Sequence, residues 1–183
     1  MVQHSFWRGA WNLSTTVTAR TDGASQNGLV TVGNLDSYAT ASETVNTVLK
    51  GVNIDLTGDA AVKAVTNAVA SGIGSMPGGW KMVGVGISNV HADIGRDGDS
   101  HTAKIIVTDG VQLKAAHIDL TAYNEGNSTV DFIAGMTKAV VSVQKTKQPT
   151  RNWYDTGILL DGGTVLESTA AGSAEQPDLR LRS

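Results

Sequence analysis

The chain has 183 residues and a mass of 19.0 kDa, which is the size of a single domain. A net charge of −3, with 17% charged and 5% aromatic residues, argues against a domain built for electrostatic binding of nucleic acid. The absence of cysteine excludes disulfides, thiolate catalysis, iron–sulfur clusters and cysteine-based zinc sites.

The first segment, residues 1–12, carries aromatic residues with no clear period and is expected to form an arm. Phe6, Trp7, Arg8 and Trp11 are the residue types enriched at protein interfaces, so they are candidates for subunit contacts. The alternative is that they cover the edge of the domain's own core. The segment has no basic region followed by an apolar core, so we expect no signal peptide, and a location in the host cytoplasm or in a virion.

An N-terminal hairpin is expected next. Residues 13–20 are rich in β-branched side chains, and residues 29–32 form a second apolar run. The polar segment 21–28 between them is typical of a long hairpin tip.

Two helices follow in the prediction. Thr40 and Glu43 have the spacing of a capping box for a helix over 37–50. Asp59 can cap a second helix, in which Val62, Val65, Val69 and Ile73 recur at helical spacing. A short strand over 52–56 separates the two helices.

The centre of the domain, about 80–123, is predicted to be an antiparallel β-meander. Val83, Val85 and Ile87 alternate in the first strand, and residues 104–108 form the second. Asp109-Gly110 is the two-residue turn signal that precedes the third strand, residues 111–123.

A third helix is expected over about 129–146, although residues 139–143 would serve equally as a strand. Residues 153–160 are predicted to be the last strand, and residues 162–183 an extended or mobile tail. No internal repeat of useful length is evident. The predicted fold class is therefore α+β, with a single domain over 13–161, two or three helices packed on the sheet, and extended terminal arms.

The densest polar cluster lies between two predicted strands. His91, Asp93 and His101 are possible ligands of a divalent ion, although their spacing matches no metal motif. The segment Asp97–Ser100 between them is typical of a solvated turn, and its residues Asp97, Asp99 and Ser100 are candidates for contacts with neighbouring subunits.

A basic stretch precedes the last strand. Lys145, Lys147 and Arg151, followed by Trp153 and Tyr154, have the composition of a weak single-stranded nucleic-acid contact, but a solvated surface explains the charges equally well. The two aromatic residues are also interface candidates.

Enzymatic motifs are missing from the sequence. It has neither a Gly-x-Ser-x-Gly nucleophile elbow nor a phosphate-binding Gly-Lys-Ser/Thr, and it implies no cofactor. The composition, rich in small and β-branched residues, is typical of self-assembling structural proteins such as bacteriophage tail-tube, capsid, connector and decoration proteins. We therefore expect a non-enzymatic homo-oligomer that contacts itself and other virion proteins but no membrane. The alternative is a small metal-dependent enzyme or ligand-binding domain that uses His91, Asp93 and His101.

Overall fold

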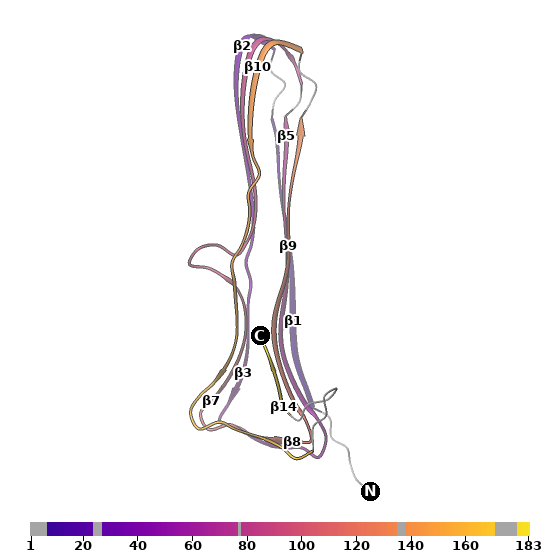
Figure 1. Ribbon diagram of the computed structural model, residues 1–183, viewed down its shortest axis with the longest axis vertical. Helices are drawn as coiled ribbons and strands as arrows, with labels where there is room; N and C mark the ends of the chain where they lie inside the picture. Colours follow the sequence, from indigo (N-terminus) through magenta and orange to yellow (C-terminus); the bar gives the residue numbers. More distant parts are fainter. Residues whose placement is uncertain (1–6, 24–26, 77, 135–137, 171–178) are drawn as a thin grey trace.

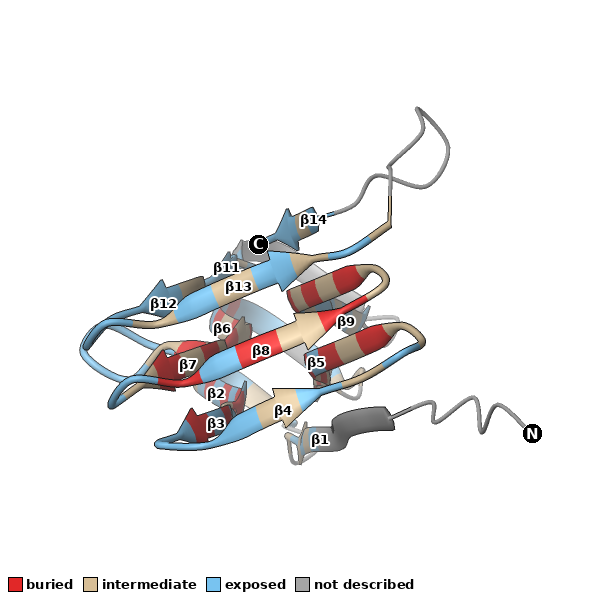
Figure 2. Ribbon diagram, turned by 90° about the horizontal axis from the view of Figure 1, so that it is seen from below, coloured by how far each residue is buried: buried red, intermediate tan, exposed pale blue. Residues whose placement is uncertain are grey.

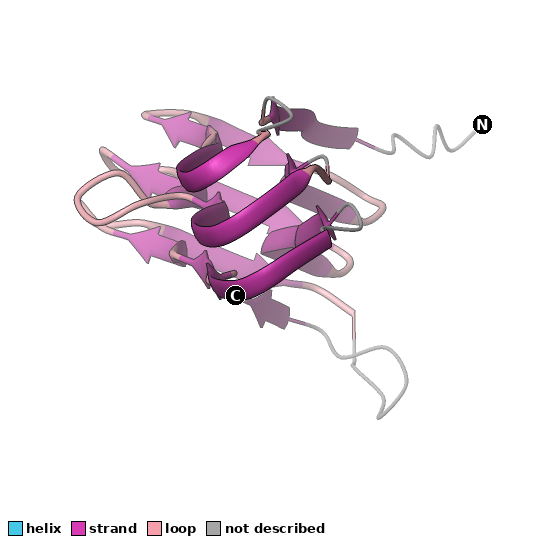
Figure 3. Cartoon of the chain, turned by 90° about the horizontal axis from the view of Figure 1, so that it is seen from above, coloured by secondary structure: helices cyan, strands magenta, loops and turns pink. Residues whose placement is uncertain are grey.

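The computed structural model describes residues 7–23, 27–76, 78–134, 138–170 and 179–183. Within these residues the chain consists of strands and loops, without a helix (Figure 3). The strands wind into three successive coils of a parallel β-solenoid, in which each coil stacks on the one before it.

Each coil contains two long strand segments followed by two short ones. The first coil comprises β1 (Trp7–Asp22), β2 (Gly28–Ala41), β3 (Thr44–Lys50) and β4 (Asn53–Asp55). The second comprises β5 (Ala60–Met76), β6 (Trp80–Ile94), β7 (His101–Thr108) and β8 (Gln112–Ala115). The third comprises β9 (Ile118–Ala134), β10 (Lys138–Lys147), β11 (Thr150–Asn152), β12 (Tyr154–Leu160) and β13 (Val165–Ser168), and β14 (Leu179–Arg182) follows it.

Equivalent strands of successive coils pair in parallel and form four sheets. Sheet A contains β1, β5, β9 and β14; sheet B contains β2, β6, β10 and β11. Sheet C contains β3, β7 and β12, and sheet D contains β4, β8 and β13. Figure 2 shows the short strands of the three coils stacked in rows.

The molecule has a narrow arm and a wider base (Figure 1). Sheets A and B run face to face along the arm, and sheets C and D close the base. The main apolar core fills the base, where Val62, Ile105, Val107, Leu113 and Leu120 are buried. A smaller cluster of mostly alanine side chains continues the core toward the arm.

The inner face of the arm is lined by small side chains. Along β5 from Ala64 onward and along β6 as far as Ala92, the buried positions are Ala64, Thr66, Ala68, Ala70, Gly72, Gly74, Gly84, Gly86, Ser88, Val90 and Ala92. A Cβ atom on Gly72 would lie 2.5 Å from the carbonyl oxygen of His91, and one on Gly74 would lie 2.5 Å from Cγ2 of Val90. The close approach of the two sheets therefore requires glycine at these positions.

The predicted α+β class is wrong, and so are all three helices. The segments 37–50, 59–73 and about 129–146 contain strands instead. In β5 the apparent helical spacing has a simple origin. Val65, Val69 and Ile73 are four residues apart, and any even spacing keeps side chains on one face of a strand. They lie on the outer face, whereas Val62 points into the core.

The antiparallel meander is also wrong. β6, β7 and β9 belong to three different sheets, and each pairs in parallel with a strand of a neighbouring coil. Asp109 and Gly110 do adopt the predicted positive φ values of 59° and 72°, but their turn joins sheet C to sheet D rather than two paired strands. A turn signal specifies the local backbone and not the pairing of the strands beside it.

The expected N-terminal hairpin is wrong for the same reason, because its two strands lie in sheets A and B. Residues 7–12, expected to be an arm, begin β1, and the expected C-terminal tail contributes β13 and β14.

The chain also has a structural repeat that the sequence analysis missed. Trp7 pairs with Ala60, an offset of 53 residues, and Ala60 pairs with Ile118, an offset of 58. The coils share inward and outward alternation rather than residue identity.

The glycine-lined contact leads to a stability prediction. We expect Gly72→Ala to lower the free energy of unfolding by about 1–3 kcal/mol, because the added methyl group meets backbone atoms of β6. Gly157→Ala in β12 is the matched control, since its Cβ would meet no atom within 4 Å. Urea denaturation of both variants measures the effect, and equal stabilities would contradict a tight inner face.

Candidate functional site

The structure separates the three residues considered as metal ligands. His91 and Asp93 lie on the outer face of β6, where the His91 ring stacks on Tyr38 with centroids 4.6 Å apart. His101 begins β7 and points into the interior, where it is fully buried. In the described part of the chain, no three His, Cys, Asp or Glu side chains are grouped as metal ligands.

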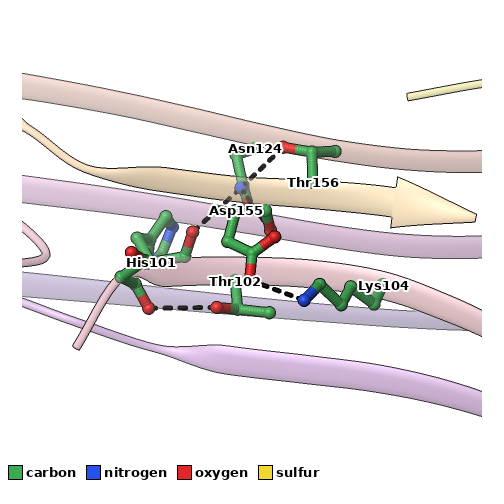
Figure 4. Close-up of polar contacts among 7 residues, drawn as sticks. His101, Thr102, Lys104, Asn124, Asp155 and Thr156 are labelled. Atoms are coloured by element: carbon green, nitrogen blue, oxygen red, sulfur yellow. Dashed lines mark hydrogen bonds and ion pairs between the residues drawn. The ribbon is translucent and has the colours of Figure 1, made fainter. Parts of the chain in front are cut away.

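The buried His101 belongs to a polar cluster at the corner where sheet B gives way to sheet C (Figure 4). Asn124 on β9 donates hydrogen bonds from Nδ2 to the carbonyl oxygen of His101 and to Oγ1 of Thr156, both at 3.0 Å. Its Oδ1 accepts a hydrogen bond from Thr66. Asn124 thus ties sheet A to the corner strands, which is a structural role.

The charge state of the corner follows from the same geometry. The backbone N–H of Glu43 donates to Nδ1 of His101 over 3.1 Å, which requires Nδ1 to be unprotonated. Burial lowers the pKa of His101 and raises the pKa of Glu43. Both carboxyl oxygens of Glu43 are buried without a hydrogen-bond partner among the described residues. His101 is fully buried and Glu43 is only 7% exposed, so we assign this pair to the packing of the corner.

A pH-dependent stability difference is expected from Glu43. Because its folded-state pKa is raised, the stability that its carboxyl contributes is present below the ordinary pKa of 4.5 and is lost as the pH rises through the folded value. Glu43→Gln should therefore be more stable than the wild type at pH 7, and the gap should narrow toward pH 4.5. Titration of His101 affects the stability of the wild type and of Glu43→Gln alike, so it does not change the difference between them. Thermal unfolding across this range tests the prediction, and a gap independent of pH would contradict it.

The predicted turn around Asp97 is a projecting loop of the second coil, at the junction of sheets B and C (Figure 1). Ala41 pairs with Ile94 at an offset of 53, but Thr44 pairs with Thr102 at an offset of 58, so the second coil has five extra residues here. The loop makes several contacts within itself. Arg96 and Asp99 exchange two backbone hydrogen bonds of 3.0 Å and form an ion pair of 3.3 Å. Asp97 and Asp99 are exposed, whereas Ser100 is half-buried.

The predicted aromatic contacts fall in three different places. Phe6 lies outside the described residues. Trp7, Arg8 and Trp11 lie in β1 opposite Ala60, Ala61 and Ala64, and their side chains are outside the described part.

Near the other end, Trp153 is half-buried at the corner. Tyr154 is 42% exposed and meets the His101 ring edge-on. Burial raises the pKa of Tyr154.

Lys145, Lys147 and Arg151 are exposed on the third coil. They lie on the outer face of sheet B, in register with Ile87, Asn89 and Asp93. This register places them on the third coil, at one end of the solenoid.

The feature that sequence reasoning missed is the pair of open coil ends. Among the described residues, β1–β4 each pair on one side only, and so do β10, β12 and β13. At the third-coil end, side chains that are in register with buried residues of the preceding coil are exposed. Leu160, Leu179 and Leu181 are in register with buried Val107, Ile118 and Leu120, yet they are 44%, 40% and 47% exposed. The sequence of β5 carried a signal for this architecture. Small side chains recur at every second position through most of its 17 residues, and a strand of this length is longer than an ordinary strand.

Comparisons with protein-family models, curated proteins and solved structures gave no match to this chain. No helix in the described part is long and apolar enough to cross a membrane. Neither the fold nor the comparisons support the narrower expectation of a virion or bacteriophage component, and we do not retain it.

Proposed function

We propose that this chain is a non-enzymatic structural protein that self-associates through the ends of its solenoid. The single observation that carries the proposal is that interior leucine side chains and strand edges are exposed together at the third-coil end. Stable solenoids cover such ends with polar capping repeats, because an open edge is a template for further strands.

The physical basis is the same contact that holds the coils together. Each coil is stabilised by backbone hydrogen bonds and by apolar rows shared with its neighbour. An added coil would make both kinds of contact at an open end. Strand addition of this type supplies affinity through the main chain and specificity through side-chain register.

The first test is the mass of the full chain in solution. Light scattering on a size-exclusion column should give masses that are multiples of 19.0 kDa and increase with concentration. Negative-stain images of the same peak should show particles lengthened along the stacking direction. A 19.0 kDa monomer at every concentration would contradict self-association.

A matched pair of variants tests where association occurs. Leu160→Lys places a charge in the exposed interior row of the third coil and should weaken association. Val83→Lys places the same charge on the outer face of sheet B in the second coil and should leave association unchanged. The reverse result would assign the contact to the side of the solenoid.

A further inference from the structure

Resting on the proposed function, we propose that the partner of the third-coil end is the first coil of a second copy, docked in the register that successive coils already use. The interface would join the edges of β10–β13 in one copy to those of β2–β4 in the next. Such a contact is head-to-tail, so it leaves both outer ends free to add further copies.

The shapes of the two ends agree. β2 has 14 residues, opposite β10 with 10 and β11 with 3; β3 and β12 both have 7. The corner between sheets B and C is short in the first and third coils, because the five-residue insertion occurs only in the second. The projecting loop therefore does not stand between the two docked coils.

Charge complementarity fixes the register. Asp36 pairs in register with Asn89, and Asn89 pairs with Lys147 on the next coil. Docking in this register places the exposed Lys147 of one copy beside the exposed Asp36 of the second. Within the chain, Asn89 already donates to Asp36 over 2.7 Å across the first two coils.

Neighbouring coils use the same kind of contact elsewhere. Lys104 pairs with Asp155 at 2.5 Å, and Lys114 pairs with Glu167 at 3.3 Å, both between the second and third coils. Opposite charges on neighbouring coils therefore already accompany coil stacking in this protein. Lys114 and Glu167 are in matched register, whereas Lys104 and Asp155 are offset by two residues. The Lys147–Asp36 contact would repeat that arrangement between copies.

Apolar side chains match at the same junction. On the outer face of sheet C, Val48, Ile106 and Leu159 form one row across the three coils. Docking would place Leu159 beside Val48 of the second copy, and both are exposed in the single chain. In the interior, Leu160 would meet Leu49, because both are in register with Val107.

Two features of the chain oppose the docking. Asp55 and Glu167 both pair with Lys114, so the junction would bring these two carboxylates together. β14 occupies beside β9 the four positions that Trp7–Ala10 of the second copy would need. Sheets B, C and D therefore carry the contact, and β1 of the second copy can reach β9 only from Trp11 onward.

A charge-reversal experiment tests the register. Asp36→Lys alone and Lys147→Asp alone should each weaken association roughly tenfold, because each creates a like-charge contact at every junction. A mixture of the two variants should associate like the wild type, since every junction between unlike copies again joins opposite charges. The double variant in one chain should do the same.

Matched controls change the same charge away from the ends. Asp97→Lys in the projecting loop and Lys63→Asp on β5, both in the second coil, should not alter the dissociation constant. Asp55→Lys should strengthen association several-fold by removing the repulsion from Glu167. The circular dichroism spectrum of each variant, compared with that of the wild type, is the control for folding.

The outcomes separate the two proposals. A wild-type chain that remains monomeric overturns self-association and this docking together. A wild-type chain that associates, but whose charge reversals have no effect or are not rescued by mixing, leaves self-association standing and overturns the head-to-tail register.

Discussion

The contact on which this structure depends is the parallel pairing of each strand with the equivalent strand of a neighbouring coil. β6 lies between β2 and β10, and β7 lies between β3 and β12, so the second coil is the best supported part of the chain. Within the described residues, no strand of a coil pairs with another strand of the same coil. A single coil therefore has no hydrogen-bonded sheet of its own, and its stability comes from its neighbours.

This constraint explains both the narrow arm and the behaviour expected at the ends. Small inward side chains let sheets A and B close on each other without a thick core between them. The parallel pairing between equivalent strands is repeated from coil to coil. Among the described residues it is missing on the outer side of the first coil, and on the outer side of β10, β12 and β13 in the third. Leu160, Leu179 and Leu181 then lie exposed although their counterparts one coil earlier are buried. The surface that we propose for self-association is therefore a continuation of the apolar core onto exposed side chains.

Part of this structure could be read from the sequence. The alternation of Val83, Val85 and Ile87 correctly indicated a strand, and the Asp109-Gly110 turn has the expected backbone conformation. The faces could not be assigned, because Val83, Val85 and Ile87 point outward, and Gly84 and Gly86 between them point inward. A period of two specifies a strand, but small residues on the inner face reverse the usual rule that the larger apolar side chains are the buried ones.

The pairing partners could not be predicted for a different reason. Strands in register lie 53 to 61 residues apart, as in Trp7 with Ala60 and Leu179 with Ile118, and their residues are seldom alike. Parallel pairing at such distance depends on the whole coil and leaves no local signal. The candidate site could not be predicted for the same reason. Lys147 was noted for its charge, but the contact that we propose for it is with Asp36 of a second copy, a residue of the first coil.

Hydrogen exchange at low and high protein concentration tests the central claim most directly, that stacked coils end in open edges that accept further coils. The account predicts the strongest protection in β6 and β7 at every concentration. As concentration rises, β2 and β3 at one end should gain protection together with β12 and β13 at the other, while the loop around Asp97 remains unchanged. Association accompanied by new protection at that loop, with none at the end strands, would contradict the account.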